Sequence, residues 1–152
     1  MTTIQTEKID TKAVEALRAR LRGALLRPGE EGYDEARAAW NLNARQRPAV
    51  VVMAEVADDI LGAVRFGRDE GLGIGVMATG HGVGAPCDGG LLVNTSRMRG
   101  ARIDPVARTA RVEAGALWKD VIPEAQAHGL AGLAGSAPHV GVVGYTMGGG
   151  FG

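Results

Sequence analysis

A histidine flanked by glycines is the residue of this sequence best placed to do chemistry. The apolar run at residues 74–78 is followed at once by residues 79–84, in which His81 lies between Gly80 and Gly82. Glycine has no Cβ, so a ligand can approach the backbone closely, and successive N–H groups in such a turn cradle phosphate. A neutral imidazole is also a nucleophile. These residues predict a loop that binds a phosphate-bearing cofactor and carries His81 to its reactive part.

A second glycine-rich stretch, residues 135–152, could form the other wall of the same site. Glycine makes up 24 of the 152 residues, whereas its average share is about 7%. The glycines gather after apolar runs and have no Gly-X-Y period. One such loop alone indicates a turn, but two in a chain of this length favour cofactor binding.

Charge and composition exclude several classes of partner. Lys+Arg and Asp+Glu both number 17, and a net charge of zero argues against binding nucleic acid by neutralising its phosphates. The single cysteine, Cys87, rules out a disulfide framework and a Cys-rich zinc site, so no metal is expected. The N-terminus has no apolar signal core, and no apolar run approaches the roughly 18 residues that span a bilayer. We therefore expect no membrane partner and a cytoplasmic location.

The first elements expected from hydrophobic periodicity are a helix and a strand. Val14, Leu17, Leu21 and Leu25 form one stripe, which predicts a helix over residues 11–26. A polar connection follows, with Tyr33, Trp40 and Asn41 as candidate anchors. The continuous β-branched run at residues 49–53 then predicts a buried strand.

A β-α-β unit is predicted to lead into the first glycine loop. Residues 56–70 form a helical pattern ended by Gly71, and residues 73–79 form the next strand, buried over its apolar part. This order implies a right-handed crossover and parallel pairing. The expected apolar face of the helix comprises Ile60, Leu61, Val64 and Phe66.

The rest of the chain is predicted to hold a short strand, a hairpin and a helix. Residues 91–94 form the strand, residues 102–104 and 109–114 the hairpin, and residues 117–128 the helix, with Trp118 in the core. The alternation in the second hairpin strand predicts that Ala110, Val112 and Ala114 face inward.

The first loop also fits a dinucleotide-binding fingerprint literally. Residues 80–85 match G-x-G-x-x-G/A, but the Rossmann fold needs a helix directly after the loop. Residues 85–90, APCDGG, have no helical period. An NAD-dependent dehydrogenase is therefore an alternative that a nicotinamide-cofactor titration without binding would dismiss.

An ordered set of motifs runs through residues 34–152. In chain order it occupies residues 47–51, 58–60, 76–82, 92–98, 112–116, 121–123, 135–141 and 144–150. In this set the sequence resembles the FAD-linked oxidases with a PCMH-type (vanillyl-alcohol-oxidase-like) FAD-binding domain, in particular the berberine-bridge-enzyme-like group.

The resemblance implies an α+β fold, a PCMH-type FAD-binding domain of two α/β subdomains. Residues 1–47 would be an N-terminal helix and connection, residues 48–115 the first subdomain, and residues 116–152 the start of the second. We expect the second subdomain to be incomplete, because a glycine-rich loop rarely ends a domain.

The resemblance also implies the cofactor and its contacts. The first loop would wrap the FAD pyrophosphate, with His81 bound covalently to the flavin 8α-methyl. The residues that would contact FAD are Met77, Ala78, Thr79, Gly80, His81, Gly82, Val83, Ser136, Ala137, Gly141, Gly144, Tyr145, Gly148 and Gly149. Residues 77–81 depart from the common R-S-G-G-H form, and Ala137 occupies the position of a second linking cysteine, so a single histidyl bond is expected.

Two interpretations of the residues and of the function stay open. His81 could instead only hydrogen-bond a phosphate or a backbone carbonyl. The implied activity is oxidation of a small organic substrate by hydride transfer to FAD, which O2 reoxidises. The alternative is a non-catalytic nucleotide- or flavin-binding module, because the sequence contains no visible substrate domain or catalytic base.

Overall fold

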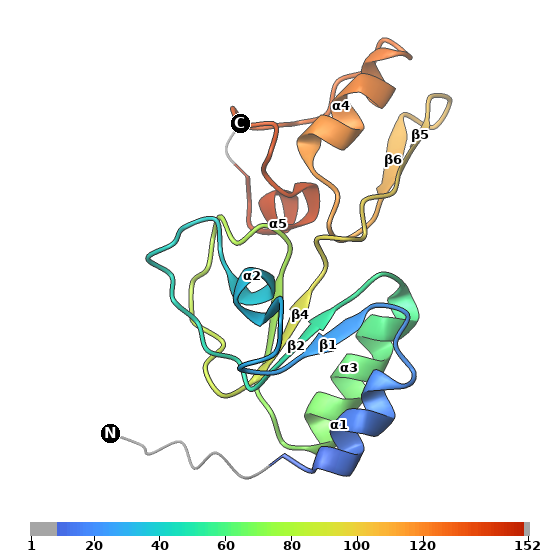
Figure 1. Cartoon of the computed structure of the whole chain (residues 1–152). Coiled ribbons are helices and arrows are strands. Elements are labelled where there is room, and N and C mark those ends of the chain that lie inside the picture. The colour runs from blue at the N-terminus through green and yellow to red at the C-terminus, as the bar shows by residue number, and fades with distance from the viewer. Residues whose placement is uncertain (1–8, 151–152) are drawn as a thin grey trace. The chain divides into compact units, whose positions relative to one another are not determined.

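The computed structural model describes residues 9–150. The chain divides into two compact units, with the boundary between Thr95 and Ser96. The first unit holds the elements α1 (Thr11–Arg18), β1 (Ala24–Leu26), α2 (Tyr33–Arg37), β2 (Val50–Met53), α3 (Ala57–Asp69), β3 (Ile74–Met77) and β4 (Leu91–Asn94) (Figure 1). The second unit holds β5 (Ala101–Asp104), β6 (Thr109–Val112), α4 (Trp118–Gln126) and α5 (Val142–Met147). This mixture of helices and separate sheets confirms the predicted α+β class. The borders predicted after Arg47 and after Gly115 stay predictions.

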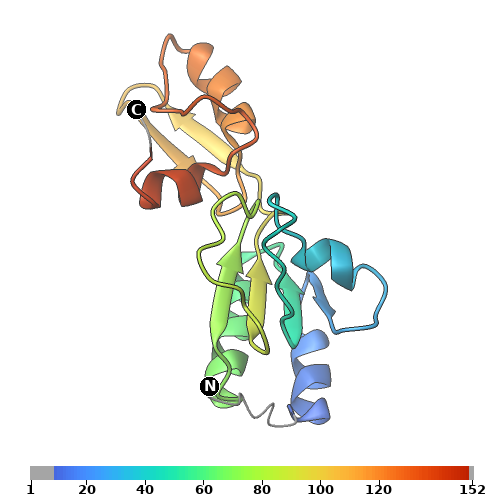
Figure 2. The ribbon, with the colours of Figure 1, turned by 90° about the vertical axis from the view of Figure 1, so that its left-hand side faces the viewer.

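The first unit is built on a four-stranded sheet with the order β1-β2-β4-β3 (Figure 2). β2, β4 and β3 are parallel, with Val50 and Ile74 both paired to Leu91, and β1 is antiparallel to β2. The predicted crossover does place two parallel strands in one sheet. They are not neighbours, however, because β4 is inserted between them.

Helices cover both faces of this sheet. α1 packs beside α3, which contacts β4 on one face, and α2 contacts β2 and β4. On the α2 face Val51, Met53 and Leu92 form a core with Tyr33 and Ala36. Because both faces are covered, every residue of β2 and β4 is buried, as the uninterrupted apolar run predicted.

The prediction of one helix over residues 11–26 is wrong. α1 ends at Arg18, and Ala24–Leu26 form β1, with Leu25 only 4% exposed in the sheet. Gly23 explains the break, since a Cβ on it would lie 1.9 Å from the Met53 carbonyl oxygen. The chain must pass this close to β2 to pair with it, and a continuing helix cannot do so.

The helix predicted over residues 56–70 is confirmed as α3, and Gly71 follows it with a φ of 65°. Its predicted apolar face is partly wrong, because Leu61 and Val64 are 46% and 42% exposed. The buried residues are Asp59, Ala63, Phe66 and Gly67. Small residues let the helix approach closely, since a Cβ on Gly67 would lie 2.9 Å from the Ile74 side chain.

β3 is exposed although its sequence predicted a buried strand. It lies at the edge of the sheet, and Val76 and Ile74 are 71% and 40% exposed. Only Met77 of this strand is buried. An apolar run does not distinguish an edge strand from a central one, and the inserted β4 takes the central place.

The second unit is a hairpin packed with two helices. β5 and β6 pair antiparallel from Ala101–Val112 to Asp104–Thr109, which confirms the predicted hairpin. Trp118, Val121 and Val142 form the core of the unit, and Trp118 is 5% exposed as predicted. Of the three residues expected to face inward, Val112 and Ala114 are half-buried, whereas Ala110 is exposed.

An ion pair joins the start of the second unit to α4. Arg99 donates from Nε and Nη2 to the two carboxylate oxygens of Asp120, at 2.6 and 2.5 Å. Asp120 also accepts from the Leu117 N–H at 2.8 Å. The hydrogen bonds from Arg99, ahead of the opposing cost of burial, lower the pKa of Asp120 below its usual value.

We expect Arg99→Ala to lower the free energy of unfolding of the second unit by about 1 kcal/mol, because a bidentate pair that is partly open to water is worth little more. Hydrogen exchange at the α4 amides would measure it. Arg102→Ala removes an exposed arginine of β5 and serves as the control. Equal effects of the two variants would contradict the prediction.

Candidate functional site

The first loop, residues 79–84, follows the carboxyl end of β3. Residues 78–90 connect β3 to its parallel neighbour β4 without a helix. This absence confirms that the loop lacks the context of a Rossmann fingerprint. This connection packs against the α2 face of the sheet through Val83, which lies in the first loop, and Cys87, which lies beyond it.

Gly80 fastens the loop to the segment that follows α2. Its φ is 72°, and a Cβ on it would lie 2.6 Å from the Ala39 Cα. The Trp40 N–H donates to the Thr79 carbonyl at 3.0 Å. Both contacts are made by backbone atoms, so they fix the backbone positions from which the Thr79 and His81 side chains extend.

The His81 ring has two side-chain neighbours. Its Nδ1 lies 2.8 Å from the Thr79 hydroxyl, and its ring stacks on the Trp40 indole with centroids 4.6 Å apart and planes 13° apart. The imidazole is half-buried. Among the residues from 9 to 150, no hydrogen-bond partner is recorded for its Nε2.

The backbone of the loop fits a pyrophosphate. A Cβ on Gly82 or Gly84 would meet no atom within 4 Å, so open space lies in front of both. Within the described part of the chain, no protein acceptor takes the N–H groups of residues 80–84. Consecutive free N–H groups beside open space are the donor set that an anionic phosphate requires. The loop therefore matches the phosphate-bearing part of FAD, with an imidazole beside it.

Met77 and Ala78 take a different place from the rest of the predicted contacts. The Met77 side chain is 6% exposed in the core, and its carbonyl accepts the Thr95 N–H at 2.8 Å. Ala78 is half-buried. The structure thus brings Thr79, Gly80 and His81 together with Trp40 in the loop that follows β3, whereas Met77 is the last residue of the strand.

Two buried amide side chains, which the sequence analysis missed, support the loop. Gln46 is 2% exposed and donates to the Arg37 carbonyl at 2.9 Å, and its Oε1 accepts the Cys87 N–H at 3.5 Å. Asn94 donates to the Ala36 carbonyl at 2.8 Å. Asn94 follows an apolar run directly, which is a usable sequence signal, whereas Gln46 lies in a polar segment with none.

Cys87 is a half-buried thiol. Burial is the main cause that raises its pKa above the usual value, so less of it is thiolate at neutral pH. A Cβ on Gly75 would lie 3.0 Å from the Cys87 sulfur, so the thiol packs against β3. This packing leaves His81 as the candidate nucleophile of the first loop.

The late loop, residues 135–150, lies in the second unit. Tyr145 packs there between two glycines, since a Cβ on Gly135 or Gly150 would lie 2.9 Å from its ring, and it meets Trp118 edge-on at 5.8 Å. Gly141 is buried and precedes α5, whereas Ser136, Ala137, Gly144, Gly148 and Gly149 are exposed. The N–H groups of Gly148 and Gly149 already bond the carbonyls of Gly144 and Thr146, at 3.0 and 3.3 Å, and the Tyr145 ring holds the loop together.

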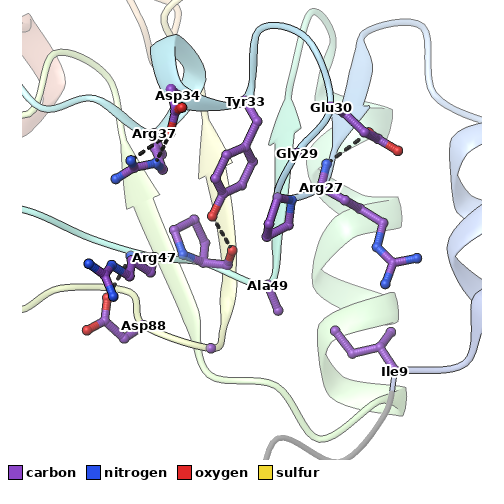
Figure 3. Close-up of a pocket in the computed structure, with 13 residues that line it drawn as sticks. Ile9, Arg27, Gly29, Glu30, Tyr33, Asp34, Arg37, Arg47, Ala49 and Asp88 are labelled. Atoms are coloured by element: carbon purple, nitrogen blue, oxygen red, sulfur yellow. Dashed lines mark hydrogen bonds and ion pairs between the residues drawn. The ribbon is translucent and has the colours of Figure 1, made fainter.

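A cavity of about 990 Å³ in the first unit is lined by none of the predicted site residues (Figure 3). It lies at the amino end of β2, and the Tyr33 hydroxyl crosses it to donate to the Pro48 carbonyl at 2.6 Å. The first loop follows the carboxyl end of the parallel strand β3, at the other end of the sheet. Three arginines and three acids line the cavity, so it has no net charge to select an anion: Arg27, Arg37, Arg47, Glu30, Asp34 and Asp88.

Residues 9–150 contain no group of three or more His, Cys, Asp or Glu side chains that could hold a metal ion. In the same range, no helix has the length and apolar character needed to cross a membrane.

Comparison with known proteins identifies the matching family. The model of a family described as FAD binding domain matches residues 48–152. An FAD-linked oxidoreductase of Dictyostelium discoideum is 34% identical over 133 residues, which cover 87% of this chain and 29% of that protein.

Solved structures give the same result. A glucooligosaccharide oxidase from Acremonium strictum, with a 6-S-cysteinyl, 8α-N1-histidyl FAD, matches with a TM-score of 0.79 and 29% identity, over 91% of this chain and 30% of that one. The BBE-like 1 protein of Physcomitrella patens matches with a TM-score of 0.74 and 29% identity, over 91% and 31%. The chain therefore spans less than a third of the length of these relatives. With its helix-free phosphate loop after β3 and the match over residues 48–152, this chain belongs to the PCMH-type FAD-binding domain family that includes the berberine-bridge-enzyme-like proteins.

Proposed function

We propose that this chain is the FAD-binding part of an oxidase that holds its flavin through a covalent bond to His81. When bound, FAD accepts a hydride from a small organic substrate and passes the electrons to O2. The residues of this chain hold the cofactor: the N–H groups of the first loop bind the pyrophosphate, and the imidazole binds the flavin 8α carbon. The exposed part of the late loop around Ser136 and Ala137 contributes further contacts.

The observation that carries this proposal is the placement of His81 in the first loop. The ring stacks on Trp40 in a loop whose N–H groups, at residues 80–84, have no acceptor within the described part of the chain, and open space lies in front of Gly82. The histidyl FAD of the related glucooligosaccharide oxidase supports the same role here. Attachment replaces one C–H bond of the 8α-methyl and one N–H bond of the imidazole by a C–N bond. Two protons leave to solvent, and the two electrons reduce the flavin and then O2, giving hydrogen peroxide.

Acid precipitation of the protein, purified at its full natural length, tests this proposal. The pellet is expected to keep its yellow flavin after washing, because acid unfolds the protein and releases only flavin that is not covalently bound. His81→Ala should move all flavin to the supernatant. His128→Ala, which changes an exposed histidine just beyond α4, should leave it in the pellet. A colourless pellet from the unmodified protein would overturn the covalent bond.

A further inference from the structure

Two side chains from separate segments hold the His81 ring on its face and at its edge. Trp40, just beyond α2, covers a face of the imidazole at 4.6 Å, and the Thr79 hydroxyl meets Nδ1 at 2.8 Å. A ring held by a stack and a hydrogen bond has lost its freedom to rotate about its side-chain torsions. The conformational entropy of this side chain is therefore lost when the protein folds, before any ligand binds.

Burial does not account for the position of Trp40. Its side chain is 68% exposed, so it gains less from leaving water than a core tryptophan does. The backbone places it, because the Trp40 N–H is bonded to the Thr79 carbonyl and Ala39 lies against Gly80. The stacked partner of this exposed indole is His81, which indicates that the contact serves the histidine.

The Thr79 hydroxyl also fixes the direction of the imidazole nitrogens. A hydroxyl can donate to Nδ1 or accept from it, and either arrangement directs Nδ1 toward Thr79 at 2.8 Å. In the part of the chain that the structure describes, the ring has no other hydrogen bond, so Thr79 decides which nitrogen is engaged and which is free.

We propose that Trp40 and Thr79 are positioning residues that hold the His81 imidazole in the orientation needed for flavin attachment. This inference rests on the proposed function. A nucleophile held in one orientation reacts faster than a mobile one, because the entropy of alignment has already been lost. Neither side chain needs to contribute to FAD affinity, since the N–H groups of the first loop bind the pyrophosphate.

The test is the rate of covalent incorporation when FAD is added to flavin-free protein of full natural length. Samples are quenched in acid at intervals, and the flavin in each pellet is measured. Trp40→Ala and Thr79→Val should each slow incorporation at least about tenfold, and this loss should exceed any loss of FAD affinity, which is measured within seconds of mixing. Trp40→Phe and Thr79→Ser keep the aromatic face and the hydroxyl, and should recover most of the rate.

Leu42→Ala is the matched control, because Leu42 is 78% exposed and lies in the same segment as Trp40. Nitrogen NMR of the flavin-free protein gives a readout independent of the cofactor. The chemical shift of His81 Nδ1 should change in Thr79→Val, which loses the hydrogen bond at that nitrogen, and should stay the same in Leu42→Ala.

The outcomes separate the two proposals. If the unmodified protein never retains flavin in the pellet, the covalent function itself fails. If it does, but Trp40→Ala and Thr79→Val incorporate flavin at the unmodified rate, the positioning role is overturned. A loss of FAD affinity that matches the loss of rate would also overturn it, because both residues would then be binding residues.

Discussion

Asp59→Ala is expected to lower the free energy of unfolding of the first unit by about 3 kcal/mol, since it leaves four N–H donors, in partly buried hydrogen bonds, without this acceptor. The carboxylate is 2% exposed and accepts the N–H groups of Arg22, Gly23, Glu55 and Val56 at 2.8, 3.1, 2.9 and 3.3 Å. It thereby joins the chain before β1 to the start of α3. Urea unfolding of the chain, followed by far-ultraviolet circular dichroism, would measure the loss.

Asp58→Ala is the matched control for this prediction. Asp58 is the neighbouring acid in the same first turn of α3, but it is exposed. Its loss removes only a helix-dipole interaction, worth about 0.5 kcal/mol. If the two variants lost equal stability, the carboxylate of Asp59 would act only through the dipole and the four hydrogen bonds would carry no energy.

The same carboxylate predicts an acid-dependent loss of stability. Burial is the largest single influence and would raise the pKa of Asp59, but the four N–H donors together outweigh it, so the pKa lies below the usual value. The stabilisation is therefore complete above the unfolded pKa of about 3.9, and it is lost as the pH falls through the lower, folded pKa. Asp59→Asn, which cannot ionise, should be less stable at pH 7 and should lose less on acidification.

Asp59 also shows how far the sequence could predict this fold. The helical pattern over residues 56–70 places it in the first turn of α3, where it accepts the N–H groups of Glu55 and Val56. Its bonds to Arg22 and Gly23 join segments 37 and 36 residues apart, and no local pattern encodes them. These distant contacts fall in the stretch after Arg18 where the helix was predicted to continue, so the helical stripe of the sequence ran on too far.

The order of the strands was beyond local pattern for the same reason. Apolar runs located β2, β3 and β4 to within one or two residues. Whether a strand is central or at the edge depends on which others pair with it, and β4 inserts beside β2 only after the chain has passed through β3 and the first loop. The exposed Val76 is a consequence of that pairing, not of its own sequence.

The candidate site shows the same difference between local sequence signals and contacts made by distant segments. Glycines around one histidine are a local signal, so the sequence alone located the first loop and predicted His81. Trp40 meets His81 only because the segment beyond α2 packs on Gly80, and the sequence suggested no more than an anchor there. Of those candidate anchors, Tyr33 is confirmed, since it is 6% exposed and bonded to Pro48.

Gly80→Ala is expected to cost about 3 kcal/mol of unfolding free energy, from adding a side chain both at a positive φ and into a filled space. The new Cβ would lie 2.6 Å from the Ala39 Cα and 2.7 Å from its Cβ. Because the closer atom is backbone, the added change Ala39→Gly should not restore stability. Gly82→Ala, two residues on, faces no atom within 4 Å, and should change stability by less than about 0.5 kcal/mol. Urea unfolding of these three variants beside the unmodified chain would measure the changes in stability. Full recovery in the double variant would contradict the prediction, because the fit between the first loop and the segment beyond α2 would then depend on side chains alone. The backbone contact that places His81 beside Trp40 would not be the reason that Gly80 is necessary.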